Sequence, residues 1–229
     1  MIPLKDNLRL RRPALLTIAL VAANVLAFLW EISAGAPGEP ISFRIQRAAL
    51  VGGAIPYEIV TWRDVGPPDL VPPPFTIFTS MFIHGGWVHL GGNMLFLWVF
   101  GPAVEDALGR LRFLGFYAAS GVAAALTQTL LSFAAGDPLV PMVGASGAIA
   151  GVLAAYLVLF PWARVLTVVP IFVFVRFLYL PATFFIGLWF VLQVFYAIIG
   201  GGGSGVAFFA HVGGFVCGWL LVKVMTASR

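Results

Sequence analysis

Long apolar runs constrain this chain more than any other feature of its sequence. A helix needs about 20 mainly apolar residues to cross a bilayer, and six segments approach that length with few charges. Hydrophobic residues make up 61% of the 229 residues and charged residues only 10%, a balance untypical of a water-soluble domain. We therefore expect an integral membrane protein with spans near 14–32, 87–104, 111–134, 145–161, 177–199 and 207–226.

These spans predict an all-α, polytopic membrane protein in which residues 1–229 form a single domain. Residues 33–86 are the one long excursion, an extended and ordered first loop. Residues 164–175 are expected to form an interfacial or cytoplasmic segment, with Arg176 snorkelling at the start of the fifth span. The glycine-rich residues 200–205 predict a short flexible link before the last span.

Basic residues indicate how the spans are oriented. The short N-terminus, residues 1–13, is basic and directly precedes the first span, and counting spans places most other basic residues on the same side. By the positive-inside rule both termini are cytoplasmic. The residues on that side are Lys5, Arg9, Arg11, Arg12, Arg110, Arg112, Arg164, Lys223 and Arg229.

Composition and motifs argue against several other classes of protein. The 13 Lys and Arg residues are scattered over helix ends rather than gathered in a patch, so the net charge of +4 does not indicate a nucleic-acid partner. Cys217 is the single cysteine, and no His-Glu-x-x-His motif occurs, so we expect no disulfide, no metal and no cofactor. No span carries the interior aspartate of an aspartyl protease, and no internal repeat suggests a transporter.

Four polar residues stand out because polar groups inside a bilayer are costly and mark function. His89 and Asn93 are four residues apart on one face of the second span, Ser146 opens the fourth, and His211 lies about one turn into the sixth. These three spans all run from outside to inside, so the four side chains fall in one shallow layer below the outer surface. They are therefore able to meet.

Small residues predict that two of these spans pack closely. Gly147 and Gly151 form a small-xxx-small pair on the fourth span, and Gly214 and Gly218 form another on the sixth. Such pairs let helix backbones approach each other, which favours a hydrogen bond between the serine and the sixth-span histidine.

The chemistry that this set indicates is acyl transfer. A base such as His211 activates the Ser146 hydroxyl by taking its proton, and a tetrahedral intermediate needs donors for its oxyanion. His89, the Asn93 amide and backbone N–H groups at the start of the fourth span are suitable donors. No acidic residue is available to complete a triad, so we expect a dyad with His211 oriented by packing.

Three motifs in this order resemble the rhomboid intramembrane serine proteases: "HGGWVHLGGNMLFLWVFGPAVEDALG", "GASG" and "AHVGGFVCG". The resemblance covers nearly the whole chain and implies the basic bacterial six-span form in the cell (inner) membrane. It implies a serine endopeptidase that cuts single-span membrane proteins in or near the outer end of their transmembrane segment. The implied site residues are Ser146 as nucleophile, His211 as general base, His89 and Asn93 as oxyanion donors, and Gly144 as a residue shaping that site.

The same resemblance implies how substrates and lipid meet the protein. The first loop would lie partly in the membrane, and the fifth span with the 200–206 loop would form a gate for the substrate helix. Trp189 and Gln193, one helical turn apart, are the candidates for the gate surface. A small residue before the cut and a readily unwound substrate helix are expected, because a helical carbonyl is internally bonded and must be freed.

One position departs from the family pattern. Some members carry an aromatic residue four positions after the serine, where it packs on the base; here that position is Ala150. We expect another aromatic residue, such as Phe208 or Phe215, to support the His211 ring, or the ring to be held less tightly.

Other interpretations stay open at this point. His84 is interpreted as an interfacial polar residue, and Glu105 with Arg110 as a structural clamp at the cytoplasmic turn. The alternative function is that of a non-catalytic rhomboid-like protein that binds transmembrane helices, although such proteins usually lack the serine or the histidine, and this chain has both.

Overall fold

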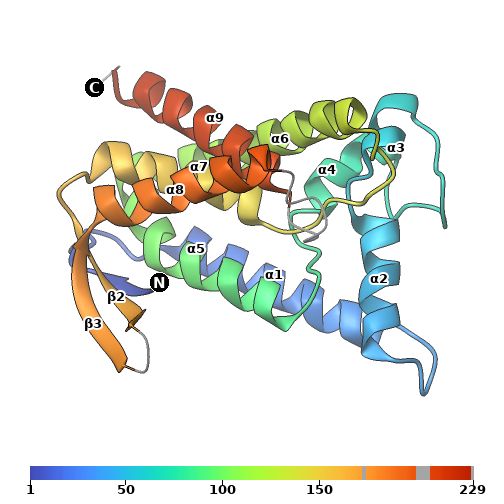
Figure 1. Cartoon of the computed structure of the whole chain (residues 1–229), viewed down its shortest axis with the longest axis horizontal. Helices are drawn as coiled ribbons and strands as arrows, with labels where there is room; N and C mark the ends of the chain where they lie inside the picture. Colours follow the sequence, from blue (N-terminus) through green and yellow to red (C-terminus); the bar gives the residue numbers. More distant parts are fainter. Residues whose placement is uncertain (172–173, 200–206, 228–229) are drawn as a thin grey trace.

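The computed structural model describes residues 1–171, 174–199 and 207–227 (Figure 1). Most of them are helical, and a small sheet lies at one end of the helical bundle. The helices are α1 (Leu15–Ser33), α2 (Ile41–Gly52), α3 (Pro56–Thr61), the 3₁₀ turn Pro73–Phe75, α4 (Thr76–Thr79), α5 (Trp87–Leu108), α6 (Arg110–Ala135), α7 (Ser146–Leu159), α8 (Ala182–Ile198) and α9 (Phe208–Ala227). The strands are β1 (Ile2–Asp6), β2 (Arg164–Ile171) and β3 (Phe174–Pro181).

The long helices show a multi-pass membrane protein. Among the described residues, α1, α5, α6 and α9 are long and apolar enough to cross a membrane. The other two expected spans correspond to α7 and α8, which are apolar but have only 14 and 17 residues. At 1.5 Å per residue α7 is about 21 Å long, shorter than the bilayer core, so a full count of six spans stays a prediction.

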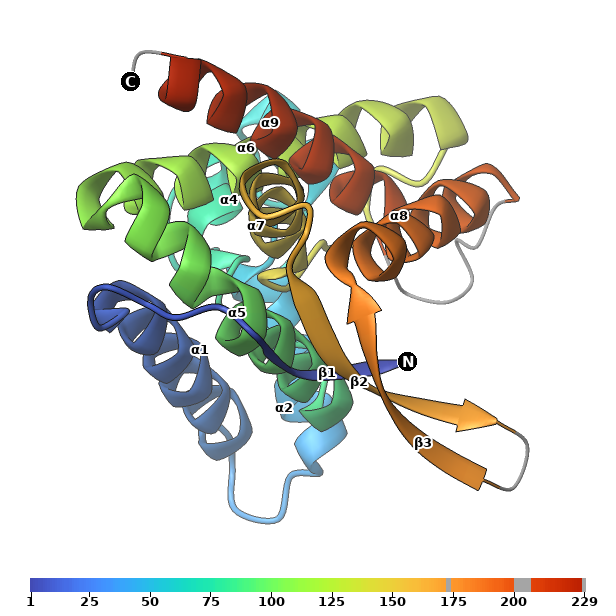
Figure 2. The same cartoon turned by 90° about the vertical axis from the view of Figure 1, so that its left-hand side faces the viewer.

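The expectation of an all-α fold is wrong at the end of the bundle where the sheet lies. β1, β2 and β3 form an antiparallel sheet in that order, and Ile2 lies opposite Val168 (Figure 2). Residues 164–181 are rich in β-branched and aromatic side chains, which favour strands, and Pro181 ends the hairpin at the helix start. Helix α8, which corresponds to the fifth expected span, therefore begins at Ala182 and not at 177.

The expected position of Arg176, at the start of the fifth span, is wrong for the same reason. Arg176 lies on β3 opposite Val169 and is exposed, so it is not at the start of α8. The apolar run from 177 was interpreted as one helix because β3 and α8 are both apolar and join without a polar break.

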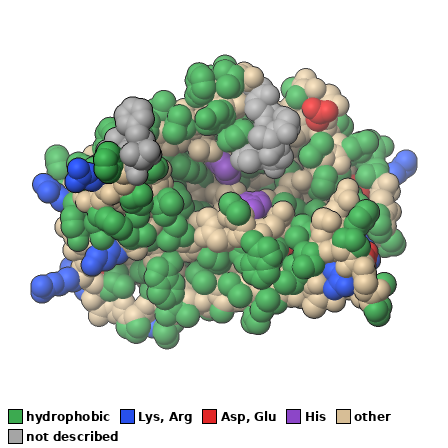
Figure 3. Space-filling view, turned by 60° about the horizontal axis from the view of Figure 1, so that its bottom comes forward, with side chains coloured by type: hydrophobic (Ala, Val, Ile, Leu, Met, Phe, Trp, Pro, Cys, Tyr) green, Lys and Arg blue, Asp and Glu red, His purple; other side chains and the backbone are tan. Residues whose placement is uncertain are grey.

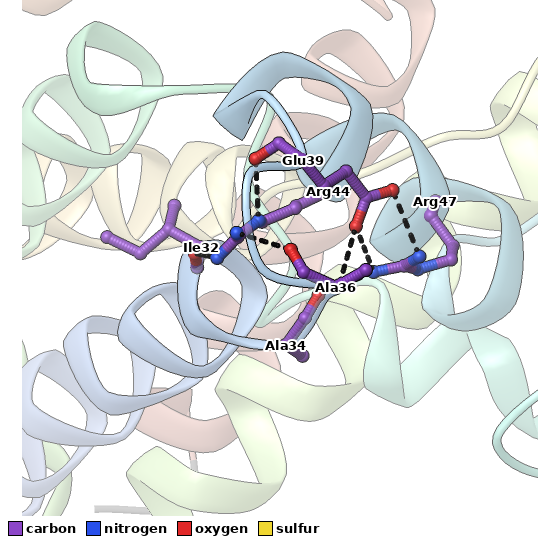
Figure 4. Close-up of polar contacts among 6 residues, drawn as sticks. All are labelled: Ile32, Ala34, Ala36, Glu39, Arg44 and Arg47. Atoms are coloured by element: carbon purple, nitrogen blue, oxygen red, sulfur yellow. Dashed lines mark hydrogen bonds and ion pairs between the residues drawn. The ribbon is translucent and has the colours of Figure 1, made fainter.

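The first loop is ordered by helices and by a cluster of arginine contacts. Arg44 Nη1 donates to the Ile32 carbonyl at 2.9 Å and Nη2 to the Ala36 carbonyl at 3.0 Å. Arg47 Nη1 forms an ion pair with Glu39 Oε1 at 3.1 Å. These bonds join the end of α1 to α2 across the turn between them (Figure 4), so the loop leaves the first span at a fixed angle.

Helix α7 is the centre of the bundle. Figure 2 shows it end-on, surrounded by α5, α6, α8 and α9, and every residue from Gly147 to Tyr156 is buried. Its small residues face those of α9: a Cβ on Gly218 would lie 2.5 Å from the Gly151 Cα. The close approach predicted from the glycine pairs is present.

Glu105, near the C-terminal end of α5, joins this helix to the start of α1. Its Oε2 accepts hydrogen bonds from the Thr17 backbone N–H and hydroxyl, both at 2.7 Å, and Oε1 accepts from the Leu16 N–H at 3.0 Å. The Arg110 Nε is further away, at 3.8 Å. The residue is structural, as expected, but it mainly satisfies the free N–H groups at the start of α1.

Candidate active site

Ser146 and His211 lie at the contact between α7 and α9. Ser146 is the first residue of α7, and His211 is in the first turn of α9. The Ser146 Oγ lies 2.7 Å from the His211 Nε2, which is a short hydrogen bond. Gly147 and Gly214 lie against each other beside this pair and leave no side-chain bulk between the helices.

A second group of residues borders the serine on the α5 side. Gly144 has φ of +111°, and a Cβ there would lie 2.6 Å from the His89 Nε2 and 3.3 Å from the Asn93 Nδ2. Both polar side chains therefore lie over the backbone just before Ser146. Only glycine is suited to this position, because its φ is in the left-handed region and no room exists for a side chain.

Hydrogen bonds fix which atoms of His89 and Asn93 are donors. The Gly85 N–H donates to the His89 Nδ1 at 3.3 Å, so the ring hydrogen of neutral His89 is on Nε2, facing Gly144. The Asn93 Nδ2 lies 3.0 Å from the His84 Nε2. His89 and Asn93 thus both direct N–H groups toward the residues that precede Ser146.

His84 is not the interfacial residue that we expected, because it is fully buried behind Asn93. Its Nδ1 lies 3.1 Å from the Phe82 carbonyl, which can only accept, so Nδ1 carries the hydrogen and Nε2 accepts from Asn93. Burial, with the neighbouring His89, lowers the pKa of His84 to about 4 and keeps the ring neutral.

Glu31 is a buried acid near the site that the sequence analysis did not single out. Its carboxylate accepts the His84 backbone N–H, with Oε1 at 3.0 Å. The signal was present in the sequence, since Glu31 is a charged residue at the end of the first apolar run. It ties α1 to the segment that carries His84.

Gln193 and Trp189, the two gate candidates, lie against His211. The Gln193 Oε1 is 2.7 Å from the His211 Nδ1, and the Trp189 and His211 ring centroids are 5.8 Å apart. His211 was expected to be oriented by packing rather than by a carboxylate, and in the structure an amide oxygen also holds its ring. Whether these residues form a gate stays a prediction.

The aromatic support missing at Ala150 comes from other helices. Phe208 of α9 meets the His211 ring edge-on at 6.3 Å, and Trp189 of α8 covers it from another side. Phe215, the other aromatic residue expected there, stacks on Phe190 at 4.1 Å. Figure 3 shows histidine side chains in a hollow of the surface.

A protein-family model described as "Rhomboid domain" matches residues 73–228, which is more than half of the chain. The chain belongs to the rhomboid family. The match contains α5, α7 and α9 with all the residues of the candidate site, and it confirms the resemblance drawn from the three motifs.

Relatives of this rhomboid occur in bacteria and mitochondria. It is 39% identical over 99 residues to "Rhomboid protein 1, mitochondrial" of Saccharomyces cerevisiae, covering 43% of this chain and 29% of that protein. It is 38% identical over 82 residues to "Putative rhomboid protease YdcA" of Bacillus subtilis, covering 35% and 39%. With "Rhomboid protease GluP" of the same organism the identity is 41% over 81 residues, covering 35% and 15%. The similarity spans less than half of each relative's length.

Acidic residues gather at one place in the described part of the rhomboid, within the first loop. Oxygen atoms of Glu58, Asp64 and Asp69 all lie within 4.8 Å of one another. Burial and the negative charges of Glu58 and Asp64 raise the pKa of Asp69 to about 7. A proton on Asp69 therefore relieves the repulsion near neutral pH. None of the hydrogen bonds found among the described residues joins these acids to Ser146 or His211.

Proposed function

We propose that this rhomboid is an intramembrane serine endopeptidase that cleaves single-span membrane proteins within or near the outer end of their transmembrane segment. The observation that carries the proposal is the 2.7 Å hydrogen bond between the Ser146 Oγ and the His211 Nε2 in a bundle of apolar helices. Two relatives named as rhomboid proteases support it. We place the protein in the cell membrane with both termini cytoplasmic, in contact with lipid and transmembrane substrates.

The first half of the reaction is acylation. The Ser146 Oγ attacks the scissile carbonyl while its proton moves to the His211 Nε2, and the carbonyl electron pair moves onto the oxygen. The Nε2–H of His89 and the second N–H of Asn93 stabilise that oxyanion beside Gly144. The imidazolium then gives its proton to the leaving amine, and the acyl chain remains on Ser146.

Water completes the second half. It attacks the acyl-enzyme with His211 again as general base, the proton returns to the Ser146 oxygen as the ester bond breaks, and the carboxylic acid product leaves. The substrate must present an unwound carbonyl, because a helical carbonyl is already hydrogen-bonded. A preference for small residues before the cut is proposed from the resemblance to the family.

Labelling with a fluorophosphonate probe tests the nucleophile and the base. The wild-type protein should become labelled, and Ser146→Ala and His211→Ala should reduce labelling, and cleavage of a transmembrane substrate, to background. Ser120→Ala is the matched control and should label normally. This substitution removes another buried serine hydroxyl, on α6. The hydroxyl lies against Gly151, which is more than one helical turn away from Ser146 on α7.

Labelling of the Ser146→Ala variant at the wild-type rate would contradict the assigned nucleophile. A folded wild-type protein that resists the probe both in detergent and in lipid would contradict the protease proposal. That second result would favour the alternative, a helix-binding rhomboid-like protein without catalysis.

A further inference from the structure

The base of the proposed dyad is held on several sides by side chains from different helices. Ser146 of α7 occupies its Nε2, and Gln193 of α8 occupies its Nδ1, each at 2.7 Å. Trp189 of α8 and Phe208 of α9 flank the ring. His211 is therefore positioned by its neighbours and not by its own helix alone.

Gln193 has one orientation that satisfies its own amide group. Its Nε2 donates to the Trp189 carbonyl at 3.3 Å, so its Oε1 is the atom that faces His211. A carbonyl oxygen only accepts hydrogen bonds, so the neutral ring must carry its hydrogen on Nδ1. The Nε2 then has a free lone pair, which is the form that accepts the proton of Ser146.

From this geometry we propose that Gln193 is a positioning residue that holds His211 in the Nδ1–H tautomer, and that packing of α8 against α9 therefore completes the base. The proposal rests on the proposed function of the dyad. When Ser146 forms its bond to the scissile carbon, its proton goes to the His211 Nε2, and the new imidazolium keeps its Nδ1–H bond to the amide oxygen. Gln193 gains and loses no proton.

An amide in this role fits the membrane setting. A carboxylate at Nδ1 would stabilise the imidazolium more, but it would be a buried charge among apolar helices whenever the base is neutral. The Gln193 side chain is buried and neutral in both states of the base. It supplies orientation and a dipole without that desolvation cost.

Because Gln193 belongs to α8, the tautomer of His211 depends on the packing of α8 against α9. Both Trp189 and Gln193 belong to α8, which packs on α9 through aromatic contacts such as Phe190 stacked on Phe215 at 4.1 Å. A displacement of α8 from α9 removes the acceptor and the aromatic cover of His211 together. The bound substrate must therefore leave this part of α8 docked during the chemical step.

Variants at Gln193 test the proposal by the rate of fluorophosphonate labelling as a function of pH. Gln193→Met keeps the length but removes the acceptor, and should slow labelling roughly 10- to 100-fold, the effect of losing a hydrogen bond to a charged group. Labelling needs neutral His211, and Gln193→Met removes an acceptor that stabilises the protonated ring. The acid limb of the pH profile of this variant should therefore move to lower pH. Gln193→Glu should label within a few-fold of wild type at its optimum, with the acid limb moved to higher pH.

Gln128→Met is the matched control, since Gln128 bonds the Ala210 N–H of α9 but not the His211 ring. It is expected to alter thermal stability at most and to leave the shape of the pH profile unchanged. A Gln193→Met variant with the wild-type rate and profile would overturn the proposal. Rescue by Gln193→Glu distinguishes lost positioning from a general failure to fold.

A readout independent of activity separates this inference from the proposed function. The chain has only three histidines, so ¹⁵N-histidine NMR with His211→Gln for assignment reports the tautomer directly. The Nδ1–H form is expected in the wild type and should be depleted in Gln193→Met. If the tautomer depends on Gln193 but no Ser146-dependent labelling occurs, the positioning holds and the protease proposal fails. Ser146-dependent labelling with a tautomer that is independent of Gln193 would instead support the protease and overturn the positioning role.

Discussion

Asn93 has two hydrogens on its amide nitrogen, and neutral His84 accepts one of them at 3.0 Å. That bond fixes the amide so that the other hydrogen is free for a ligand near Gly144. The arrangement depends on His84 being uncharged, because a protonated ring would have a second donor where Asn93 needs an acceptor. Burial, which lowers the pKa of His84 to about 4, secures this over the physiological pH range.

A double-mutant cycle tests whether His84 acts through Asn93. Asn93→Ala should lower kcat for substrate cleavage by about 100- to 1,000-fold, as for other lost oxyanion donors. His84→Ala should cost on the order of tenfold by itself, and almost nothing more in the Asn93→Ala background, because the shared bond is already gone. Two independent, additive losses would show that His84 contributes by another route.

Sequence reasoning reached the residues on one helix face and the Ser146–His211 contact, which the glycine pairs indicate, but it missed the contact of α8 with His211. The spacing of His89 and Asn93 and the depth of Ser146 follow from helical periodicity. The contact of Gln193 with His211 depends on how α8 turns about its axis and on where it begins. Neither is encoded in the spacing of residues along one span, so Gln193 was assigned only a surface role.

At the scale of elements, the α7–α9 contact brings the serine and the histidine together. A Cβ on Gly214 would overlap the Gly147 carbonyl, and one on Gly218 would lie 2.5 Å from the Gly151 Cα. These atoms are backbone and cannot rotate away, unlike the end of a flexible side chain. The separation of the two helices is therefore set by glycine.

Gly214→Ala should force α9 away from α7 and lengthen the Ser146–His211 bond. We expect a destabilisation of about 1–3 kcal/mol from overpacking, measured by thermal or denaturant unfolding, with a clear loss of labelling. The matched control is Gly187→Ala on α8, where a Cβ meets nothing within 4 Å. Equal labelling of the two variants would mean that the helix separation does not set the site geometry.

The strands show where the sequence pattern misleads. Helix α8 and strand β3 are both apolar and adjacent in the chain, so a hydropathy window merges them. What separates them is Pro181 and the β-branched residues of the hairpin, whose preference is expressed only because β1 supplies a partner strand. That partner lies far away in the sequence.

At the scale of the whole molecule, several basic segments meet at one end. The Arg11 N–H donates to Asp106 Oδ2 at 2.8 Å, which places the N-terminal segment beside the α5–α6 turn. Pairing of β1 with β2 brings the α7–α8 connection to the same end. From the positive-inside rule we infer that this end faces the cytoplasm and that the first loop faces outward.

Cysteine accessibility tests this orientation in intact cells. In a Cys217→Ser background, Asp64→Cys in the first loop should react with a membrane-impermeant maleimide, because Asp64 is exposed and is proposed to lie on the outer side. Lys5→Cys and Arg112→Cys should react only after the membrane is opened. The opposite pattern of reactivity would reverse the proposed topology and move the candidate site to the inner leaflet.

The pairing of β1 with β2 also sets an order of events during synthesis. Ile2 precedes the first span, yet its partner Val168 follows α7, so most of the bundle is made between the two. Strand β1 must wait unpaired while those helices are inserted, and contacts of such large sequence separation form slowly. Once formed, the strand is fastened by the Tyr156 hydroxyl, which donates to Asp6 Oδ2 at 2.8 Å. Strand β1 is made before α1 and therefore reaches its native partner only after the helices from α1 to α7 have been made.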